Sequence, residues 1–457
     1  MTKTMLDTPQ TIHLIGIGGA GMAAIAEVLH GSGHTVTGSD LTASAAFERL
    51  VAMGVGAVVG HDPLNLGNPD IVCRSTSIPD TNVEVLEYEG RGGTVLRRGE
   101  LLTAMTSASR TVAVAGTHGK TTTSSMLAVI AEKAGAEPTY IIGGDVKDLG
   151  SGATAGSGEW FIIEADESDG SGFALGHTIG VVTNVEPDHL EFYGSEQAMR
   201  DAFAAFVAES DVAVVCADDE GAFALAQGSN AVTYGAREGS TYEMRDIVRS
   251  EEATTFALHR GGLPLGQLRV PMPGLHNARN ATAAAAAALE MGLPFRSIQS
   301  ALGGFSGVGR RFDDRGTLNG IDFIDDYAHL PTEVNAALSA AVDTRHDRIV
   351  TIFQPHRYSR TQALWQDFTG CFTEADLLIV TGIYSSGETP REGVSGRLIV
   401  DAVQAGSEPP PIIYHEDRTT LAQAVADMLA PGDLCLTLGA GDSVTLADEI
   451  QAILGGS

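Results

Sequence analysis

Thr111-Val112-Ala113-Val114-Ala115-Gly116-Thr117-His118-Gly119-Lys120-Thr121-Thr122-Thr123 is the stretch that decides the fold of the middle of this chain. An apolar run of strand length ends in a glycine turn, and Lys120 with the threonines behind it opens a helix. Such a turn directs backbone N–H groups and a helix N-terminus to one point, which suits phosphate oxygens. Lys120 would place a positive charge on the β- and γ-phosphates, and Thr121 would offer a hydroxyl to Mg²⁺. The stretch therefore predicts a nucleoside triphosphate site.

The loop departs from the common phosphate-binding pattern, because Val114 stands where that pattern has its first glycine. We interpret it as a tighter variant anchored on Gly116. A chance Gly-Lys-Thr after a strand is the alternative reading. The residues expected to bind the nucleotide are Gly116, Thr117, His118, Gly119, Lys120, Thr121 and Thr122.

The length, charge and cysteine content of the chain limit its number of domains and the partners it can bind. Its 457 residues are enough for about two or three domains. A formal net charge of −30 disfavours non-specific binding to nucleic acid or to an anionic membrane. The four cysteines lie far apart in or beside apolar runs, which predicts buried, reduced thiols. No basic region precedes an apolar run at the start, and the alanine-rich run 281–289 is too short to cross a bilayer, so we expect a cytoplasmic protein.

A second glycine turn lies near the start of the chain. The strand Thr11–Ile15 leads into Gly16, Gly18 and Gly21 in the spacing G-x-G-x-x-G, and Gly19 lies within the same turn. The next strand ends at Asp40, where an acid commonly meets a ribose hydroxyl. The pattern fits a dinucleotide or any other nucleoside diphosphate. Ser75 and Thr76 follow a further strand, and they either hold phosphates or cap a helix near residue 81.

Acidic residues and a histidine follow two apolar strands behind the phosphate loop. Glu164 directly ends one strand, and His189 follows the other. Because carboxyl ends of parallel strands line one crevice, we expect Thr121, Glu164 and His189 to surround Mg²⁺, with Glu167 as the alternative to Glu164. Asp169 and Glu186 are expected to be solvated cap residues.

Two further features belong to the central region. Residues 237–270 lack helical periodicity and predict a hairpin insertion. His276, Asn277 and Asn280 then open an alanine-rich helix, and they either cap that helix or face a purine base.

A third region begins after a glycine-rich hinge at residues 303–309. Strands and helices alternate again, which predicts a third parallel sheet. His356, Arg357 and Arg360 form a compact basic cluster at the end of one of its strands. A fork of two arginines is the expected way to hold a small carboxylate, whereas salt-bridged surface arginines are the alternative.

The combination predicts a ligase. An ATP site lies between a nucleotide-type site and a carboxylate clamp. A carboxylate does not react directly with an amine, because hydroxide leaves poorly. ATP solves the problem by forming an acyl phosphate, from which an amine displaces phosphate, while Mg²⁺ and Lys120 neutralise the charge in transfer.

In this order the motifs resemble those of the Mur ligases. The matching stretches are residues 16–22, 116–123, 164–169, 276–280, 309–312, 325–334, 353–361 and 439–442. Residues 353–361, Phe-Gln-Pro-His-Arg-Tyr-Ser-Arg-Thr, are similar to the form found in members that add L-alanine to UDP-N-acetylmuramate. The resemblance implies an α/β chain of three domains: a Rossmann-like UDP-substrate domain at 1–108, a central P-loop ATPase domain at 109–308, and a C-terminal Rossmann-like parallel sheet at 309–457 that binds the amino acid. It also implies a cytoplasmic, ADP-forming enzyme of peptidoglycan precursor synthesis.

The resemblance implies a role for each motif. Gly18, Gly19, Gly21, Ser75 and Thr76 would approach the UDP diphosphate, and Asp40 the ribose or uracil. Lys120, Thr121, Glu164 and His189 would form the phosphate and magnesium centre, with His276, Asn277 and Asn280 beside the adenine. Arg310, Arg311, His329, His356, Arg357 and Arg360 would face the reacting carboxylate and the alanine.

Two departures and three alternatives accompany the resemblance. Leu330 stands where the family has a second histidine, so a role for that histidine is excluded, and Gly172 is an insertion in the usual Ser-Asp-x-Ser-Phe run. A nucleotide-dependent oxidoreductase and a non-catalytic nucleotide-binding regulator are alternatives outside the family. A ligase that adds a tripeptide to the same nucleotide is the alternative within it.

Overall fold

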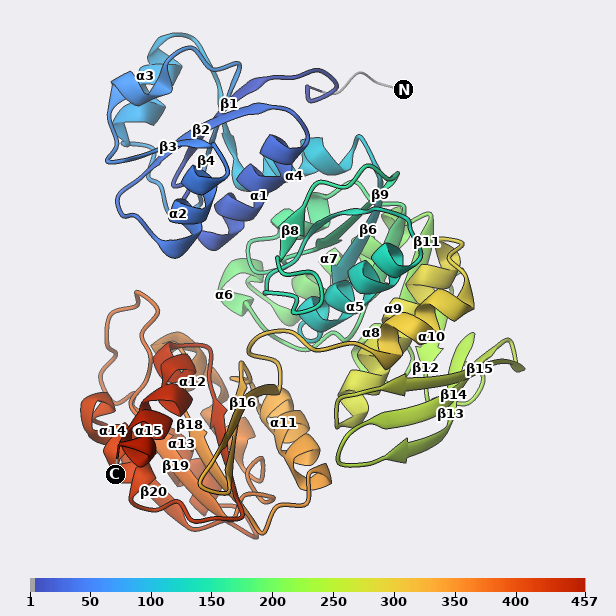
Figure 1. Cartoon of the computed structure of the whole chain (residues 1–457), viewed down its shortest axis with the longest axis vertical. Coiled ribbons are helices and arrows are strands. Elements are labelled where there is room, and N and C mark those ends of the chain that lie inside the picture. Colours follow the sequence, from blue (N-terminus) through green and yellow to red (C-terminus); the bar gives the residue numbers. More distant parts are fainter. Residues whose placement is uncertain (1–4, 457) are drawn as a thin grey trace. The chain divides into compact units, whose positions relative to one another are not determined.

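The computed structural model describes residues 5–456, and its elements form three sheets flanked by helices (Figure 1). The chain packs as two compact units. The first runs through Asp246 and includes Phe256–Leu268 and Arg279–Phe305; the second comprises Ile247–Thr255, Arg269–Ala278 and the chain from Ser306. The domain ranges expected above begin at residue 1 and end at residue 457, which lie outside the described residues, and these ranges stay a prediction.

The first sheet is a five-stranded parallel sheet in the order β3-β2-β1-β4-β5. Its strands are β1 (Thr11–Ile15), β2 (Thr35–Asp40), β3 (Gly56–Val59), β4 (Ile71–Arg74) and β5 (Val95–Arg97), and its helices are α1 (Ala20–Gly31), α2 (Ala45–Ala52), α3 (Val83–Gly90) and α4 (Arg98–Thr106). The strand order reverses between β1 and β4. In such sheets ligands bind at this switch point, outside the carboxyl ends of the strands.

A buried carboxylate ties the strands of this sheet to the loop behind β3. Glu84 on α3 is fully buried, accepts hydrogen bonds from Ser39 Oγ and Asn65 Nδ2, and lies 3.5 Å from His13 Nε2. Burial raises the pKa of Glu84, but the hydrogen bonds from these partners outweigh it and hold the pKa at about 2. The carbonyl of Ser39 accepts the N–H groups of Gly16 and Ile17, so this cluster also supports the first glycine turn.

Replacing Glu84 by glutamine is expected to lower the free energy of unfolding by about 3 kcal/mol at pH 7. Because the folded-state pKa of Glu84 lies below the unfolded value, its contribution exists above pH 4.5 and is lost as the pH falls towards about 2. Urea unfolding of both proteins at pH 7 and near pH 3.5 measures the difference, which should be smaller at the lower pH. Glu87→Gln on the exposed side of α3 is the control, with an expected cost below about 1 kcal/mol. A difference independent of pH would contradict the role of the ionised carboxylate.

The second sheet has ten strands in the order β15-β14-β13-β12-β11-β10-β6-β9-β7-β8. They are β6 (Arg110–Ala115), β7 (Thr139–Ile141), β8 (Ala153–Thr154), β9 (Trp160–Glu164), β10 (Ile179–Val182), β11 (Val212–Cys216), β12 (Val232–Gly235), β13 (Tyr242–Arg249), β14 (Thr254–Arg260) and β15 (Leu263–Val270). The expected hairpin insertion is present as β13–β15, which extends the sheet at one edge. Its helices are α5 (Lys120–Lys133), α6 (Leu190–Tyr193), α7 (Glu196–Glu209), α8 (Glu220–Ala226), α9 (Leu275–Glu290) and α10 (Phe295–Gly303).

The third sheet has the order β16-β17-β21-β18-β19-β20. The strands are β16 (Asp313–Leu318), β17 (Ile321–Asp326), β18 (Arg348–Phe353), β19 (Leu377–Thr381), β20 (Ile412–His415) and β21 (Asp433–Leu438). Strand β16, which was not predicted from the sequence, pairs antiparallel with β17. The sheet is therefore parallel except for this edge strand. The sequence Asp313–Leu318 has few apolar residues, because an edge strand needs little apolar surface.

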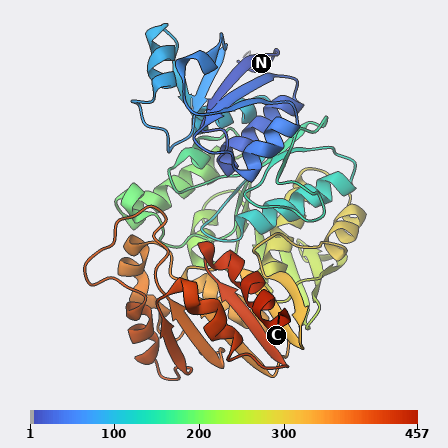
Figure 2. The same cartoon turned by 60° about the vertical axis from the view of Figure 1, so that its left-hand side comes forward.

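Alternate residues of the third sheet enter two separate cores. Ile324 and Phe353 pack under α11 (Pro331–Asp343) and α13 (Arg397–Gln404), whereas Phe323 and Ile352 pack under α14 (Arg418–Ala426) and α15 (Leu446–Gly455). Figure 2 shows helices lying on the sheet. Because helices cover both faces of the sheet, a ligand is expected to bind at the carboxyl ends of its strands.

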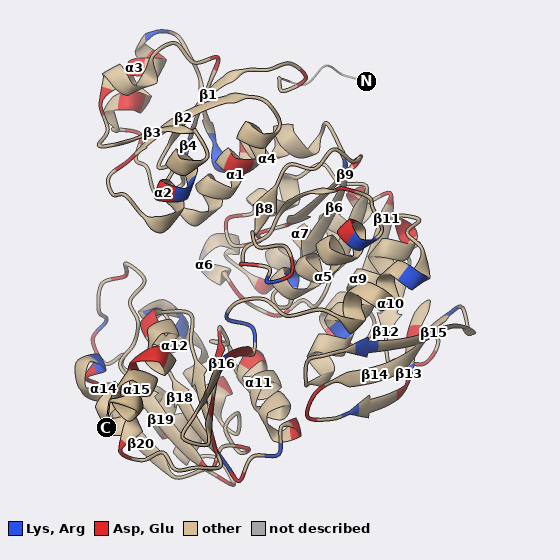
Figure 3. Cartoon of the chain, in the orientation of Figure 1, with Lys and Arg blue, Asp and Glu red and all other residues tan. Residues whose placement is uncertain are grey.

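Two expectations drawn from the composition of the chain concern its cysteines and its apolar runs. All four cysteines are buried and free, as predicted. No helix among residues 5–456 has both the length and the apolar character needed to cross a membrane. The 58 acidic residues outnumber the 28 lysines and arginines. Both kinds are scattered over the elements of all three sheets (Figure 3).

Candidate active site

The phosphate loop has a geometry that only glycine permits. Gly116 has φ +135°, and a Cβ atom there would lie 2.0 Å from Thr183 Oγ1. Gly119 has φ +78° and ends the loop at the N-terminus of α5. The loop is held from β10, because Asn184 Oδ1 accepts the N–H of His118 and Thr183 Oγ1 donates to the carbonyl of His118. The N–H groups of the first turn of α5 have no partner one turn earlier in the helix, and therefore suit an anion.

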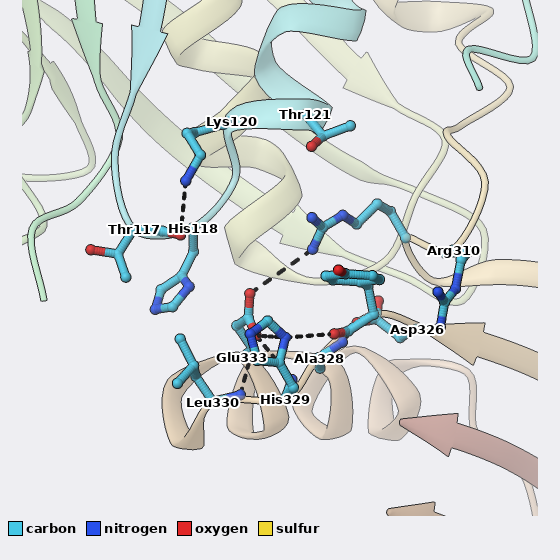
Figure 4. A network of polar contacts seen from close by, with 12 residues as sticks. Thr117, His118, Lys120, Thr121, Arg310, Asp326, Ala328, His329, Leu330 and Glu333 are labelled. Carbon is cyan, nitrogen blue, oxygen red and sulfur yellow. Dashed lines mark hydrogen bonds and ion pairs between the residues drawn. The ribbon is translucent and has the colours of Figure 1, made fainter. Parts of the chain in front are cut away.

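Lys120 is held inside this loop. Its Nζ donates to the carbonyl of Gly116 and pairs with Glu167 at 2.8 Å. It also donates to the carbonyl of Thr117 (Figure 4). Burial lowers the pKa of Lys120, but the Glu167 carboxylate raises it more, and the net pKa lies above its ordinary value. Lys120 is therefore a fixed positive charge.

The residues expected at the metal fall into two groups. Thr121 Oγ1 donates to Glu164 Oε2 at 3.2 Å, and Gly143 N donates to Glu164 Oε1 at 2.7 Å. Glu164 thus lies beside the threonine hydroxyl, whereas Glu167 pairs with Lys120. This arrangement favours Glu164 over Glu167 as the magnesium ligand, because a hydroxyl and a carboxylate oxygen side by side are hard ligands for a hard cation.

His189 has a left-handed backbone, with φ 53°, and begins α6. Its Nε2 lies 3.3 Å from Asp188 Oδ2. Within residues 5–456 no group of three or more His, Cys, Asp or Glu side chains has the geometry to hold a metal.

The residues expected beside the adenine all lie in the first two turns of α9, between Leu275 and Glu290. Asn280 belongs to the first unit and lies against the phosphate loop, because a Cβ on Gly119 would be 2.5 Å from Asn280 Oδ1. His276 and Asn277 belong to the second unit. Asn277 Nδ2 donates to the carbonyl of Pro273, so this side chain closes the turn before α9.

The first glycine turn is hydrogen-bonded to the carboxylate of Asp40. Gly16 has φ +82°, and a Cβ there would lie 2.9 Å from the Cβ of Ser75. Asp40 Oδ2 accepts the N–H of Gly18 at 2.9 Å, and Gly19 is the N-cap of α1. The turn, Asp40 and Ser75 therefore meet at the carboxyl edge of the first sheet.

The alternative role for Ser75 and Thr76 is wrong. Helix α3 begins at Val83, and its first turn is capped by Asn82, whose side chain accepts the N–H of Glu84. Ser75 is half-buried with its Oγ 3.0 Å from Ser77 Oγ, and Thr76 is exposed. Neither caps the helix, so both stay candidates for phosphate contacts.

In the second unit the two adjacent arginines separate into different roles. Arg310 Nε lies 3.3 Å from Asp325, and Arg310 Nη2 donates to the carbonyl of Gly439 at 2.7 Å, so its charge is committed to the loop behind β21. Arg311 faces Glu333 at 3.9 Å. Both guanidinium groups lie over the ring of Tyr327. This geometry makes Arg311 the better candidate for contact with a substrate.

Glu333 organises the turn before α11. Its Oε2 accepts the N–H groups of His329 and Leu330 (Figure 4). His329 Nδ1 lies 2.9 Å from the carbonyl of Tyr327. Leu330, in place of the family's second histidine, is buried. The turn therefore orients one imidazole, and an apolar side chain fills the second position.

The basic cluster after β18 is tightly arranged. Arg360 Nη1 lies 3.0 Å from His356 Nδ1, so that the guanidinium donates to a neutral imidazole. Burial and the neighbouring His329, Arg360 and Arg357 lower the pKa of His356 to about 3. Arg357 has φ 67°, and its Nε is buried without a hydrogen-bond partner among residues 5–456. A buried donor of this kind suits an anionic ligand.

Tyr384, which was not predicted from the sequence, supports this cluster. Its ring stacks on His356 with the centroids 5.7 Å apart. Its carbonyl accepts the N–H of Arg357, and its N–H donates to the carbonyl of Pro355. The signal that was overlooked is topological: Tyr384 follows the end of β19, the strand beside β18 in a parallel sheet.

Comparison with known proteins supports one family throughout. Three family models match: "Mur ligase family, catalytic domain" at residues 11–110, "Mur ligase middle domain" at 114–288, and "Mur ligase, glutamate ligase domain" at 310–441. A UDP-N-acetylmuramate–L-alanine ligase of Pelotomaculum thermopropionicum is 43% identical over 443 residues, which is 96% of each chain. The ligase of that name from a Geobacter species is 43% identical over 439 residues, 95% of each chain. Among solved structures, the UDP-N-acetylmuramate-alanine ligase of Thermotoga maritima matches with a TM-score of 0.81 and 28% identity, over 98% of this chain and 99% of its own.

Proposed function

The chain belongs to the Mur ligase family, and on that premise we propose that it joins L-alanine to the carboxylate of UDP-N-acetylmuramate, with ATP converted to ADP and phosphate. The observation that carries the proposal is similarity over almost the full length to relatives of that name. The reaction belongs to peptidoglycan precursor synthesis in the cytoplasm.

In the first step a carboxylate oxygen of the sugar nucleotide attacks the γ-phosphorus of ATP, ADP leaves, and an acyl phosphate forms. Lys120 is the residue assigned to the γ-phosphate, because its fixed positive charge lies in the glycine turn. Thr121 and Glu164, with His189, would hold Mg²⁺, and the hydroxyl and carboxylate oxygens fit a hard cation. When bound, Mg²⁺ neutralises charge on the phosphate oxygens.

In the second step the amine of alanine attacks the acyl carbon, and phosphate leaves. Arg357 and Arg360 are assigned to the alanine carboxylate, because arginine forks match carboxylates. His329 is assigned to the ammonium proton of alanine. Its Nδ1 is oriented by the carbonyl of Tyr327, which directs the basic lone pair to Nε2.

ADP release tests the proposal directly. With ATP, Mg²⁺ and UDP-N-acetylmuramate present, ADP should form only after L-alanine is added. The assay is run in parallel with glycine, L-serine and the tripeptide that the related recycling ligase uses. Turnover with the tripeptide and none with alanine would contradict the proposal, as would reduction of NAD or an absence of alanine-dependent turnover.

A further inference from the structure

Arg98 is a cation that the reaction above does not use. It is the first residue of α4, directly after β5, and therefore lies at the carboxyl edge of the first sheet. Its side chain is about one quarter exposed, with a relative accessibility of 24%. A half-buried guanidinium at the ligand-binding edge of a parallel sheet needs anionic partners.

The partners that it has are two aspartates of the central region. Arg98 Nη2 lies 3.6 Å from Asp166 Oδ2 and 3.7 Å from Asp169 Oδ2. Both distances exceed those of a charge-assisted hydrogen bond, and both carboxylates are partly exposed, so the two pairs are weak. The other oxygen of each carboxylate is used locally, by the N–H of Ser168 and the N–H of Ser171.

The rest of the guanidinium faces the first glycine turn. A Cβ atom on Gly21 would lie 3.0 Å from Arg98 Nη1, so the guanidinium packs directly on this glycine at the first turn of α1. Arg98 Nε is buried and has no hydrogen-bond partner among residues 5–456. Of the five N–H donors of the arginine, those on the glycine side lack an acceptor of matching charge.

We propose that Arg98 binds the diphosphate of the sugar nucleotide, and that Asp166 and Asp169 hold its guanidinium until the diphosphate displaces them. The inference rests on the proposed function, because it takes the first glycine turn as the diphosphate site. A diphosphate at the N-terminus of α1 supplies oxygens beside the donors that lack them. Weak aspartate pairs are readily exchanged for such a ligand.

Asp166 and Asp169 compete with the diphosphate because each places a carboxylate oxygen within 4 Å of Arg98 Nη2, at 3.6 and 3.7 Å. Asp166 also precedes Glu167, the partner of Lys120. The exchange at Arg98 therefore connects the sugar-nucleotide site with the acidic segment behind the ATP phosphate loop.

Calorimetry with the full chain tests the binding role. Arg98→Met should weaken the binding of UDP-N-acetylmuramate and of UDP by about tenfold to a hundredfold, and leave the binding of uridine unchanged. Arg97→Met is the matched control, because Arg97 is adjacent and exposed and should retain wild-type affinity. Arg98→Lys, which keeps the charge but loses the fork, should give a smaller loss. If the wild type binds UDP-N-acetylmuramate and Arg98→Met binds it equally well, the inference is wrong. Failure of the wild type to bind would instead overturn the proposed function.

A second substitution, which is expected to strengthen UDP binding, tests whether the aspartates compete with the diphosphate for Arg98. Asp169→Asn removes one holding carboxylate and should strengthen UDP binding by about twofold to fivefold, since an exposed pair is worth little. If Arg98 only joined two parts of the first unit, Asp169→Asn would weaken binding as Arg98→Met does, and that result would overturn the proposal.

Discussion

Replacing Lys120 by alanine is expected to reduce ADP formation at least about a thousandfold while UDP-N-acetylmuramate still binds. Lys120 lies in the phosphate loop and is held by the carbonyls of Gly116 and Thr117, whereas the first glycine turn belongs to a different sheet. Its proposed role is at the transferring phosphate, so its removal should leave the sugar-nucleotide site intact. A folded variant that neither forms ADP nor binds UDP-N-acetylmuramate would contradict this separation of the two sites.

The experiment needs two companions, because Lys120 has a structural partner. Removing the ammonium leaves Glu167, which is 4% exposed, as a buried carboxylate without its cation, at a cost of about 3–5 kcal/mol. The double variant Lys120→Ala/Glu167→Gln removes that penalty and should remain inactive. Lys133→Ala, at the exposed end of the same helix, is the matched control and should turn over like the wild type. Activity that returned in the double variant would show that instability, and not the missing charge, caused the loss.

Local patterns explain what the sequence predicted well. Gly116, Gly119 and Lys120 lie within one turn, so their spacing alone predicts a glycine turn at the N-terminus of α5. The same holds for the first glycine turn and for β1, which has the bounds expected. Thr183 and Asn184, which hold the phosphate loop, directly follow β10 and lie more than sixty residues after His118. Only the folded sheet brings them to His118.

Contacts between residues distant in sequence decide the choices that the sequence alone could not make. Glu164 and Glu167 are close in sequence, and only the partners Thr121 and Lys120 separate their roles. Arg310 and Arg311 are adjacent, yet a left-handed backbone at Arg310, with φ 62°, turns them towards different acids. Edge strand β16 was missed because its pattern is polar, and an antiparallel edge leaves no signal in a region dominated by parallel strands.

The backbone at Arg357 supports the role proposed for this residue at the alanine carboxylate. Its φ of 67° and ψ of 139° lie in a region that side chains other than glycine rarely adopt, and such strain costs about 1–3 kcal/mol. The hydrogen bond from its N–H to the carbonyl of Tyr384 holds this conformation. Strained backbone is found preferentially at functional sites. The guanidinium of this strained residue has a buried Nε without a hydrogen-bond partner among residues 5–456.

Arg357→Gly is therefore expected to raise the Michaelis constant for alanine by about tenfold to a hundredfold and to change that for ATP little. The same substitution should leave the melting temperature unchanged or raise it, because glycine relieves the strain. Arg360→Ala should raise the constant for alanine by a similar factor. It also removes one cause of the low pKa of His356, so that pKa should rise and the acid limb of the pH–rate profile should move to higher pH. Arg391→Ala, an exposed arginine of the same unit, is the control. Equal increases for alanine and ATP in the Arg357 and Arg360 variants would mean that the two arginines serve the phosphate, and the assignment of the carboxylate clamp would be wrong.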